Sequence, residues 1–141
     1  MNTFGMFNVY SLLGFSMKIL LIGDDPNSFQ VIIEHLNQLG CNYQFDRGSW
    51  SLYNADLLNE IDLVLVNEYH VADSGKLARL RQQTSQPIFL LSTAQDDEIL
   101  AQLYAVGVDD HLVLPVSYPI LAAKLRVWQR WIVRSSSMLP S

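Results

Sequence analysis

The sequence predicts an α/β fold in which a parallel five-stranded sheet is covered by helices. Five short runs typical of strands, most of them apolar, alternate with longer segments whose apolar residues recur at helical spacing. Several of these runs are apolar throughout, as in strands that are buried on both faces. With 141 residues, half of them apolar, the chain is long enough for one domain with a substantial core.

The first strand is expected at Lys18–Gly23, an apolar run that ends at Asp24 and Asp25. Pro26 suits the first turn of the helix that follows, because its missing N–H needs no partner there, and the aspartate before it can cap that helix. Gly40 is expected to end this helix. The apolar residues at helical spacing before that glycine are Phe29, Ile32, Ile33, Leu36 and Leu39.

The rest of the chain continues the alternation. The expected strands are Asn42–Asp46, Ile61–Val66, Pro87–Leu91 and His111–Val113. The expected helices are Trp50–Asn59, Gly75–Gln83, Asp96–Ala105 and Tyr118–Arg134, with Leu52, Leu57, Leu58, Leu77 and Leu80 inward. Right-handed crossovers between successive strands fit the flavodoxin-like strand order 2-1-3-4-5. In such sheets the functional crevice lies at the carboxyl ends of the first and third strands, which brings together Asp24, Asp25 and Asn67.

We divide the chain into a domain at residues 17–134 and two short flanking segments. Residues 1–16 carry no charge, are too interrupted to span a bilayer, and lack the positive charge that precedes the apolar run of a secretory signal. Either Met17 is the start of the protein or residues 1–16 are a mobile extension; docking of this segment on a partner is the alternative. Residues 135–141 are expected to be a flexible polar tail that resembles a truncated linker.

Composition argues against several classes of function. The net charge is -5 and the pI is about 4.9, without the clustered Lys and Arg that binding to a nucleic-acid backbone requires. The single cysteine, Cys41, excludes an intramolecular disulfide and a thiolate metal cluster, and it fits a reducing compartment. We therefore expect a cytoplasmic protein whose domain binds neither nucleic acid nor a membrane.

Two motifs carry a family resemblance. Ile61–Asn67 (IDLVLVN) is typical of a buried strand with a polar side chain at its end. Gly107–Pro115 (GVDDHLVLP) predicts a turn and a short strand, followed by a proline. Together with Asp24 and Asp25, and in phase with the other elements, they resemble the CheY-like receiver domain of bacterial two-component response regulators. The resemblance covers about residues 17–134. It implies a (βα)5 three-layer sandwich that acts as a signalling module rather than an enzyme.

The resemblance assigns roles to the polar residues of the crevice. In receivers an acid pair after the first strand holds a magnesium ion, together with a backbone carbonyl two residues past the phospho-accepting aspartate. The matching positions here are Asp24, Asp25 and Tyr69. The aspartate itself is replaced by Asn67. For Asp24 and Asp25, weak cation binding and plain helix capping both stay open.

The remaining receiver positions lie at the ends of the last two strands. Ser92 matches the hydroxyl that senses the phosphoryl group, and His111 stands at the aromatic switch position. Leu114 replaces the lysine that pairs with the phosphoryl group, whereas Pro115 after it is retained. His111 is open to two interpretations, a pH-sensitive switch and a half-buried aromatic substitute.

Two of these departures predict that the phosphoryl chemistry is lost. An amide has no anionic oxygen to attack phosphorus, and Asn67 also removes one negative charge, so magnesium should bind weakly or not at all. A buried lysine without its aspartate would be an uncompensated charge, costing roughly 3–5 kcal/mol. Asn67 and Leu114 are therefore a consistent pair of changes, and we expect no cofactor apart from weakly bound Mg²⁺.

The leading interpretation is a phosphorylation-independent pseudo-receiver in a two-component or phosphorelay context that acts through protein–protein contacts. The expected core stripe of the last helix is Leu121, Leu125, Trp128 and Ile132. Beside it, Ile120, Val127 and Trp131 should be partly exposed, as at a contact site. In the receiver family the face of the fourth helix, fifth strand and fifth helix mediates dimerisation or output, which implies a protein partner or a homodimer. Packing of Trp131 on the flanking segments is the alternative.

Two other functions stay open. One is a working, noncanonical phosphorelay receiver that uses another acceptor. The other is a small-molecule binder or minor hydrolase that uses the crevice of Asp24, Asp25 and Ser92. Against a hydrolase, we expect no histidine or lysine placed to activate Ser92, and the chain contains no P-loop or Gly-x-Gly-x-x-Gly motif.

Overall fold

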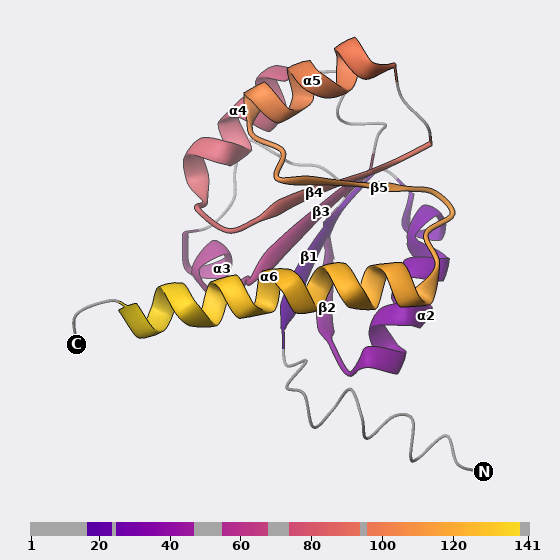
Figure 1. The fold of residues 1–141 in the computed structure, drawn as a ribbon, viewed down its shortest axis with the longest axis vertical. Helices are drawn as coiled ribbons and strands as arrows, with labels where there is room; N and C mark the ends of the chain where they lie inside the picture. The colour runs from indigo at the N-terminus through magenta and orange to yellow at the C-terminus, as the bar shows by residue number, and fades with distance from the viewer. Residues whose placement is uncertain (1–16, 24, 47–54, 68–73, 94–95, 139–141) are drawn as a thin grey trace.

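The computed structural model describes residues 17–23, 25–46, 55–67, 74–93 and 96–138, in which strands and helices alternate (Figure 1). The strands are β1 (Lys18–Ile22), β2 (Asn42–Asp46), β3 (Leu63–Asn67), β4 (Ile88–Ser92) and β5 (Asp110–Val113). The helices are the 3₁₀ turn η1 (Pro26–Phe29), α2 (Gln30–Leu39), α3 (Ala55–Glu60), α4 (Ser74–Gln83), α5 (Asp97–Val106) and α6 (Tyr118–Met138). None of these helices is both long and apolar enough to cross a bilayer.

The five strands form one parallel sheet of order β2-β1-β3-β4-β5, which confirms the predicted fold class. β1 lies between β2 and β3, and Ile22 at its end pairs with Val66 of β3. Asn67 pairs with Leu91 of β4, and Ser92 follows directly. The carboxyl ends of β1, β3 and β4 therefore lie side by side, at the edge where the sequence predicts the crevice.

The sheet separates two apolar layers (Figure 1). Helices α2 and α6 cover one face, and α3, α4 and α5 cover the other. Successive residues of β1 alternate between them: Ile19 and Leu21 belong to the first layer, and Leu20 and Ile22 to the second. Because both faces are buried, β1, β3 and β4 need apolar residues at consecutive positions, which explains their uninterrupted apolar runs.

Most predicted bounds agree with the structure to within one or two residues, but the end of the last helix was predicted wrongly. Gly40 ends α2 as predicted, with a φ angle of 79°, and Gly107 ends α5, with a φ angle of 142°. Helix α6, however, continues past Arg134 to Met138. Serine costs a helix only a few tenths of a kcal/mol more than alanine, so a serine triplet does not stop it, and the first strong breaker in the sequence is Pro140.

Some sequence predictions concern residues outside the described ranges and stay predictions. These are the nature of residues 1–16, the first part of the helix expected at Trp50–Asn59, and the cation ligands Asp24 and Tyr69. The inward orientation of Leu52, Leu57 and Ile132 also belongs here. Leu58, Leu77 and Leu80 are buried as expected.

Candidate functional site

Asn67, which the resemblance matches to the acceptor position, is buried at the end of β3 with 4% of its surface exposed. Its side-chain nitrogen Nδ2 donates a hydrogen bond to the hydroxyl oxygen of Ser28, at 2.9 Å. Ser28 in turn donates its hydroxyl proton to the backbone oxygen of Asp25, at 2.6 Å. Two hydrogen bonds thus run in series from β3 to the turn η1 that follows β1. No local pattern in the sequence marks Ser28, because its partner lies 39 residues away.

Asp25 acts as the N-cap of η1. Its backbone is extended, with φ −124° and ψ 115°, and its Oδ1 accepts a hydrogen bond from the backbone N–H of Asn27 at 2.9 Å. The capping role that the sequence left open for Asp25 is therefore present, beside the proline that starts the turn. A carboxylate accepts more than one hydrogen bond or ligand, so weak cation binding by Asp25 stays a prediction.

Gly23 allows β1, η1 and β3 to approach closely at the crevice. A Cβ atom on Gly23 would lie 2.7 Å from Cε2 of Phe29 and 3.1 Å from the Cβ of Asn67. The backbone N–H of Gly23 donates to the backbone oxygen of Asp46, at 3.1 Å, so the segment is also fixed to β2. Any side chain at this position would push against the two residues that frame the crevice.

Ser92 and His111 form a hydrogen-bonded pair, which corrects the expectation that no histidine is placed to activate this serine. The Oγ of Ser92 lies 2.7 Å from Nε2 of His111 and 3.0 Å from the backbone oxygen of Thr93. The serine hydroxyl has one proton, so when it donates to Thr93 the imidazole N–H must donate to it. Ser92 is fully buried and His111 half-buried. A nucleophile needs contact with its substrate, so this burial argues against hydrolytic use of Ser92.

Leu114, which the resemblance matches to the lysine position of receivers, extends the apolar core. Its side chain is partly buried against the layer under α2 and α6, and its backbone N–H donates to the backbone oxygen of Ser92 at 2.8 Å. Pro115 follows in an exposed turn, after a cis peptide bond. Leu114 therefore offers no ammonium group for pairing with an anion in the crevice.

The described residues by themselves do not fit a magnesium site. In the part of the chain that the structure describes, no group of three or more His, Cys, Asp or Glu side chains is close enough to hold a metal ion. The side-chain amide of Asn67 directs its N–H toward Ser28, and an N–H group cannot coordinate a cation. Asp24 and Tyr69 lie outside the described residues, so weak magnesium binding stays a prediction.

The outer side of α6 exposes the three apolar residues that the sequence singled out. Ile120 is 52% exposed, Val127 41% and Trp131 57%, as predicted. On the inner side, Leu121 and Leu125 are fully buried, and Trp128 packs its ring against Phe89 with the ring centroids 5.8 Å apart. Further exposed apolar side chains of α5 and β5 are Ile99, Tyr104 and Val113. Figure 1 shows α6 lying across the sheet with its outer side uncovered by any described element.

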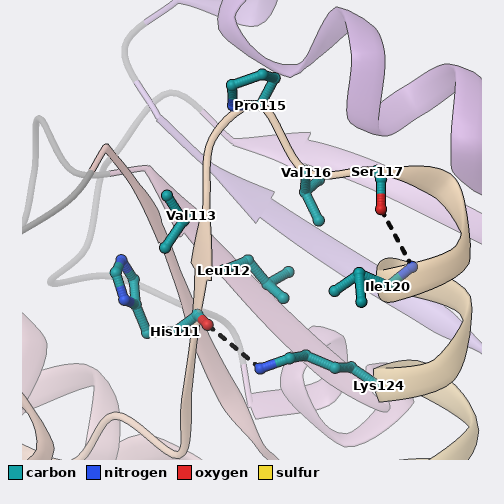
Figure 2. Close-up of a pocket in the computed structure, with 8 residues that line it drawn as sticks. All are labelled: His111, Leu112, Val113, Pro115, Val116, Ser117, Ile120 and Lys124. Carbon is teal, nitrogen blue, oxygen red and sulfur yellow. Dashed lines mark hydrogen bonds between the residues drawn. The ribbon is translucent and has the colours of Figure 1, made fainter.

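A pocket of about 320 Å³ lies between β5 and the start of α6 (Figure 2). Val113 and Pro115 from β5 and its turn, and Ile120 from α6, provide apolar walls. Lys124 stands at its edge, where its ammonium group bonds to the Asp110 carboxylate at 2.9 Å and lies 3.4 Å from the backbone oxygen of His111. The pocket is thus largely apolar, and the Lys124 ammonium group beside it is neutralised by its ion pair with Asp110.

No protein-family model matches the chain. It is 27% identical over 127 residues to the transcriptional activator protein IrlR of Burkholderia pseudomallei, in strains 1026b and K96243. The aligned region covers 87% of this chain and 55% of IrlR, so the chain spans about half the length of this relative.

Solved receiver domains share the fold. The signal receiver domain of an HD domain-containing protein from Pseudomonas fluorescens Pf-5 matches with a TM-score of 0.70 and 24% identity, over 89% of this chain and 95% of that one. A response regulator from Thermotoga maritima matches with a TM-score of 0.69 and 16% identity, over 80% and 97%. At these identities the likeness shows the fold, and the CheY-like architecture predicted from the sequence is confirmed.

Proposed function

We propose that the chain is a receiver-like signalling module of a two-component or phosphorelay pathway, cytoplasmic, not enzymatic, and independent of phosphorylation. One observation supports the independence of phosphorylation: the residue at the end of β3 is Asn67, whose amide donates a hydrogen bond to Ser28. The receiver fold and the likeness to the named transcriptional activator IrlR support the signalling role. Leu114, packed on the core, supports the absence of phosphoryl recognition.

The chemical part is tested by incubating the protein with acetyl phosphate and Mg²⁺ and measuring its intact mass. We expect no phosphoryl adduct, because neither Asn67 nor Leu114 supplies the groups that receivers use. The Asn67→Asp variant is the matched comparison, since it differs in one side-chain atom. Stoichiometric uptake by the wild-type protein would contradict the proposal and point to a noncanonical phosphorelay receiver.

We further propose that the module acts through the face of α5, β5 and α6. Helix α6 contains Lys124, Arg126, Arg130 and Arg134 and no acidic residue, although the whole chain has a net charge of -5. Its exposed Ile120, Val127 and Trp131 lie on this basic helix. The surface therefore complements a partner that offers apolar groups flanked by carboxylates.

A second copy of the chain meets these requirements. Helix α5 is capped by Asp96 and begins with Asp97 and Glu98, and it exposes Ile99 and Tyr104. An isologous contact would place this acidic, apolar helix of one copy against α6 of the other, twice per dimer. A homodimer is thus the first partner to test, and an acidic partner protein is the alternative.

Sedimentation equilibrium of two matched variants tests this surface. Val127→Asp places a charge within the face, whereas Val31→Asp changes a similarly exposed valine on α2 (41% against 48% exposed). We expect Val127→Asp to weaken dimerisation at least tenfold and Val31→Asp to leave it unchanged. Equal effects of the two variants would contradict the surface, and a wild-type protein that stays monomeric would exclude the homodimer.

A further inference from the structure

We propose that Ser28 is a positioning residue of the crevice, and that the Asn67 amide joins β3 to η1 as a hydrogen-bond donor where receivers use a cation. In receivers the magnesium ion connects the acid pair after the first strand with the aspartate at the end of the third. Here the Asn67 Nδ2 and the Ser28 hydroxyl connect the same two segments without a ligand. The inference rests on the proposed function and explains how the crevice is held without phosphorylation.

The directions of the two hydrogen bonds depend on one another. The backbone oxygen of Asp25 can only accept, so the 2.6 Å contact commits the single hydroxyl proton of Ser28 to that oxygen. At the 2.9 Å contact the serine oxygen is then the acceptor, and its partner at position 67 must be a donor. An asparagine side chain supplies that donor, whereas an ionised aspartate has none.

An ionised aspartate at position 67 would therefore remove the hydrogen bond to the Ser28 oxygen. It would not simply restore the phospho-accepting group of a receiver. Its carboxylate would face the Ser28 oxygen, and the hydroxyl proton would have to turn away from Asp25 to satisfy it. The position is also 4% exposed, so a carboxylate there would stay ionised only with a compensating positive charge, such as a bound cation. We infer that millimolar Mg²⁺ does not saturate the wild-type crevice, whereas Asn67→Asp makes it bind the ion at such concentrations.

The surrounding packing gives this contact a fixed geometry. Gly23 brings the Cβ of Asn67 and the ring of Phe29 close to the end of β1. Phe29 is fully buried, and its backbone follows Ser28 in η1. Ser28 itself is exposed, but the buried Phe29 follows it in the chain and its hydroxyl is bonded to the backbone oxygen of the Asp25 cap.

The test uses ¹⁵N NMR of the full chain, with the Asn67 side-chain amide as the reporter. Water-exchange rates of that amide are measured in the wild type, Ser28→Ala and Ser28→Thr. We expect Ser28→Ala to speed the exchange roughly five- to tenfold, as for the loss of one hydrogen bond, and Ser28→Thr to restore it because the hydroxyl returns. Ser117→Ala, which removes a hydroxyl at the start of α6, serves as the control and should change nothing at Asn67.

Titration with Mg²⁺ up to millimolar concentration supplies a second readout. The wild-type signals of residues 25–29 and 67 should stay in place, and those of Asn67→Asp should shift and saturate. The proposal is overturned by an unchanged Asn67 amide in Ser28→Ala, by failure of Ser28→Thr to restore it, or by saturable magnesium shifts in the wild type. No phosphoryl donor is present, so these results are independent of the acetyl phosphate experiment, which tests the proposed function.

Discussion

The hydroxyl oxygen of Ser92 and the Nε2 atom of His111 lie 2.7 Å apart and join the end of β4 to β5. Ser92 pairs with Val113 in the parallel register, and Leu90 pairs with His111. Ser92 and His111 are therefore diagonal neighbours, and residues two apart along a strand point to the same face of the sheet. The register, rather than any local motif, brings a serine and a histidine together beside the proposed contact face.

His111→Phe keeps an aromatic ring but removes the hydrogen bond to Ser92. We expect it to lower the free energy of unfolding by about 1 kcal/mol, and Ser92→Ala to do the same. The double variant should cost less than the sum, since both changes remove one shared contact. Urea denaturation of the four proteins measures this, and additive costs would argue that the pair makes no direct bond.

Arg81→Lys tests a junction between α4 and the turn before β5 that the sequence analysis did not predict. The Arg81 guanidinium donates to the backbone oxygens of Thr84, Gln86 and Gly107, at 2.6–3.0 Å, and to Asp109 Oδ2 at 2.8 Å. A lysine ammonium cannot span these acceptors. The variant should lose about 2–3 kcal/mol of unfolding free energy.

Arg79→Lys is the matched control for this change, because Arg79 lies on the same helix with an exposed side chain. Exposed substitutions of this kind usually stay within about 0.5 kcal/mol. Chemical denaturation compares the two variants directly. A loss at Arg81 no larger than that at Arg79 would mean that the junction contributes little.

Gly23→Ala tests the close approach of β1, η1 and β3. The added Cβ would meet Cε2 of Phe29 at 2.7 Å, so we expect a loss of about 1–3 kcal/mol from overpacking. Phe29→Leu removes that ring atom, and Gly23→Ala should cost less in this background than in the wild type. Thermal or urea unfolding measures the cycle, and an equal cost in both backgrounds would locate the strain elsewhere.

The buried thiol of Cys41 should make the free energy of unfolding depend on pH in the alkaline range. Burial raises the pKa of its thiol from the ordinary value of 9.0 to about 11, partly opposed by a backbone hydrogen bond with Met17. Between these values the folded state binds more protons than the unfolded state, so stability falls as pH rises from about 9 to about 11. The contribution is fully present below pH 9.

Cys41→Ala removes this group and should flatten the corresponding part of the stability curve. Urea denaturation at several pH values from 8 to 11 compares the slopes of the two proteins. The absolute stability of the variant is not the readout, since it also reflects the lost side-chain volume. Parallel curves for the two proteins would show that the thiol is not desolvated in the fold.

The two tryptophans of α6 are expected to have different roles, Trp128 in the packing of the fold and Trp131 in the contact with a partner. Trp128 packs on Phe89, so Trp128→Ala should lower the unfolding free energy by about 3 kcal/mol. Trp131 is 57% exposed, so Trp131→Ala should stay within about 0.5 kcal/mol while weakening dimerisation. Denaturation and sedimentation are measured on the same samples. A large stability loss at Trp131 would assign it to the core.

The elements of this fold were predictable because their signals are local. Uninterrupted apolar runs mark β1, β3 and β4 as strands buried on both faces. Gly40 and Gly107 end their helices because each adopts a positive φ that other residues disfavour. The exposure of Ile120, Val127 and Trp131 also follows from helical spacing alone. The end of α6 was missed because no strong local signal stands between Arg134 and Met138.

The sequence by itself determined the fold class, the strand order and which residues stand at the carboxyl ends of the strands. Only the tertiary structure decided their partners: Asn67 with Ser28, His111 with Ser92, and Arg81 with Asp109, which are 39, 19 and 28 residues apart. Periodicity and caps act between neighbours along the chain, so they appear in the sequence. The direction of a hydrogen bond depends on which atoms meet across strands, and that is fixed only when the sheet register and the packed turns bring them together.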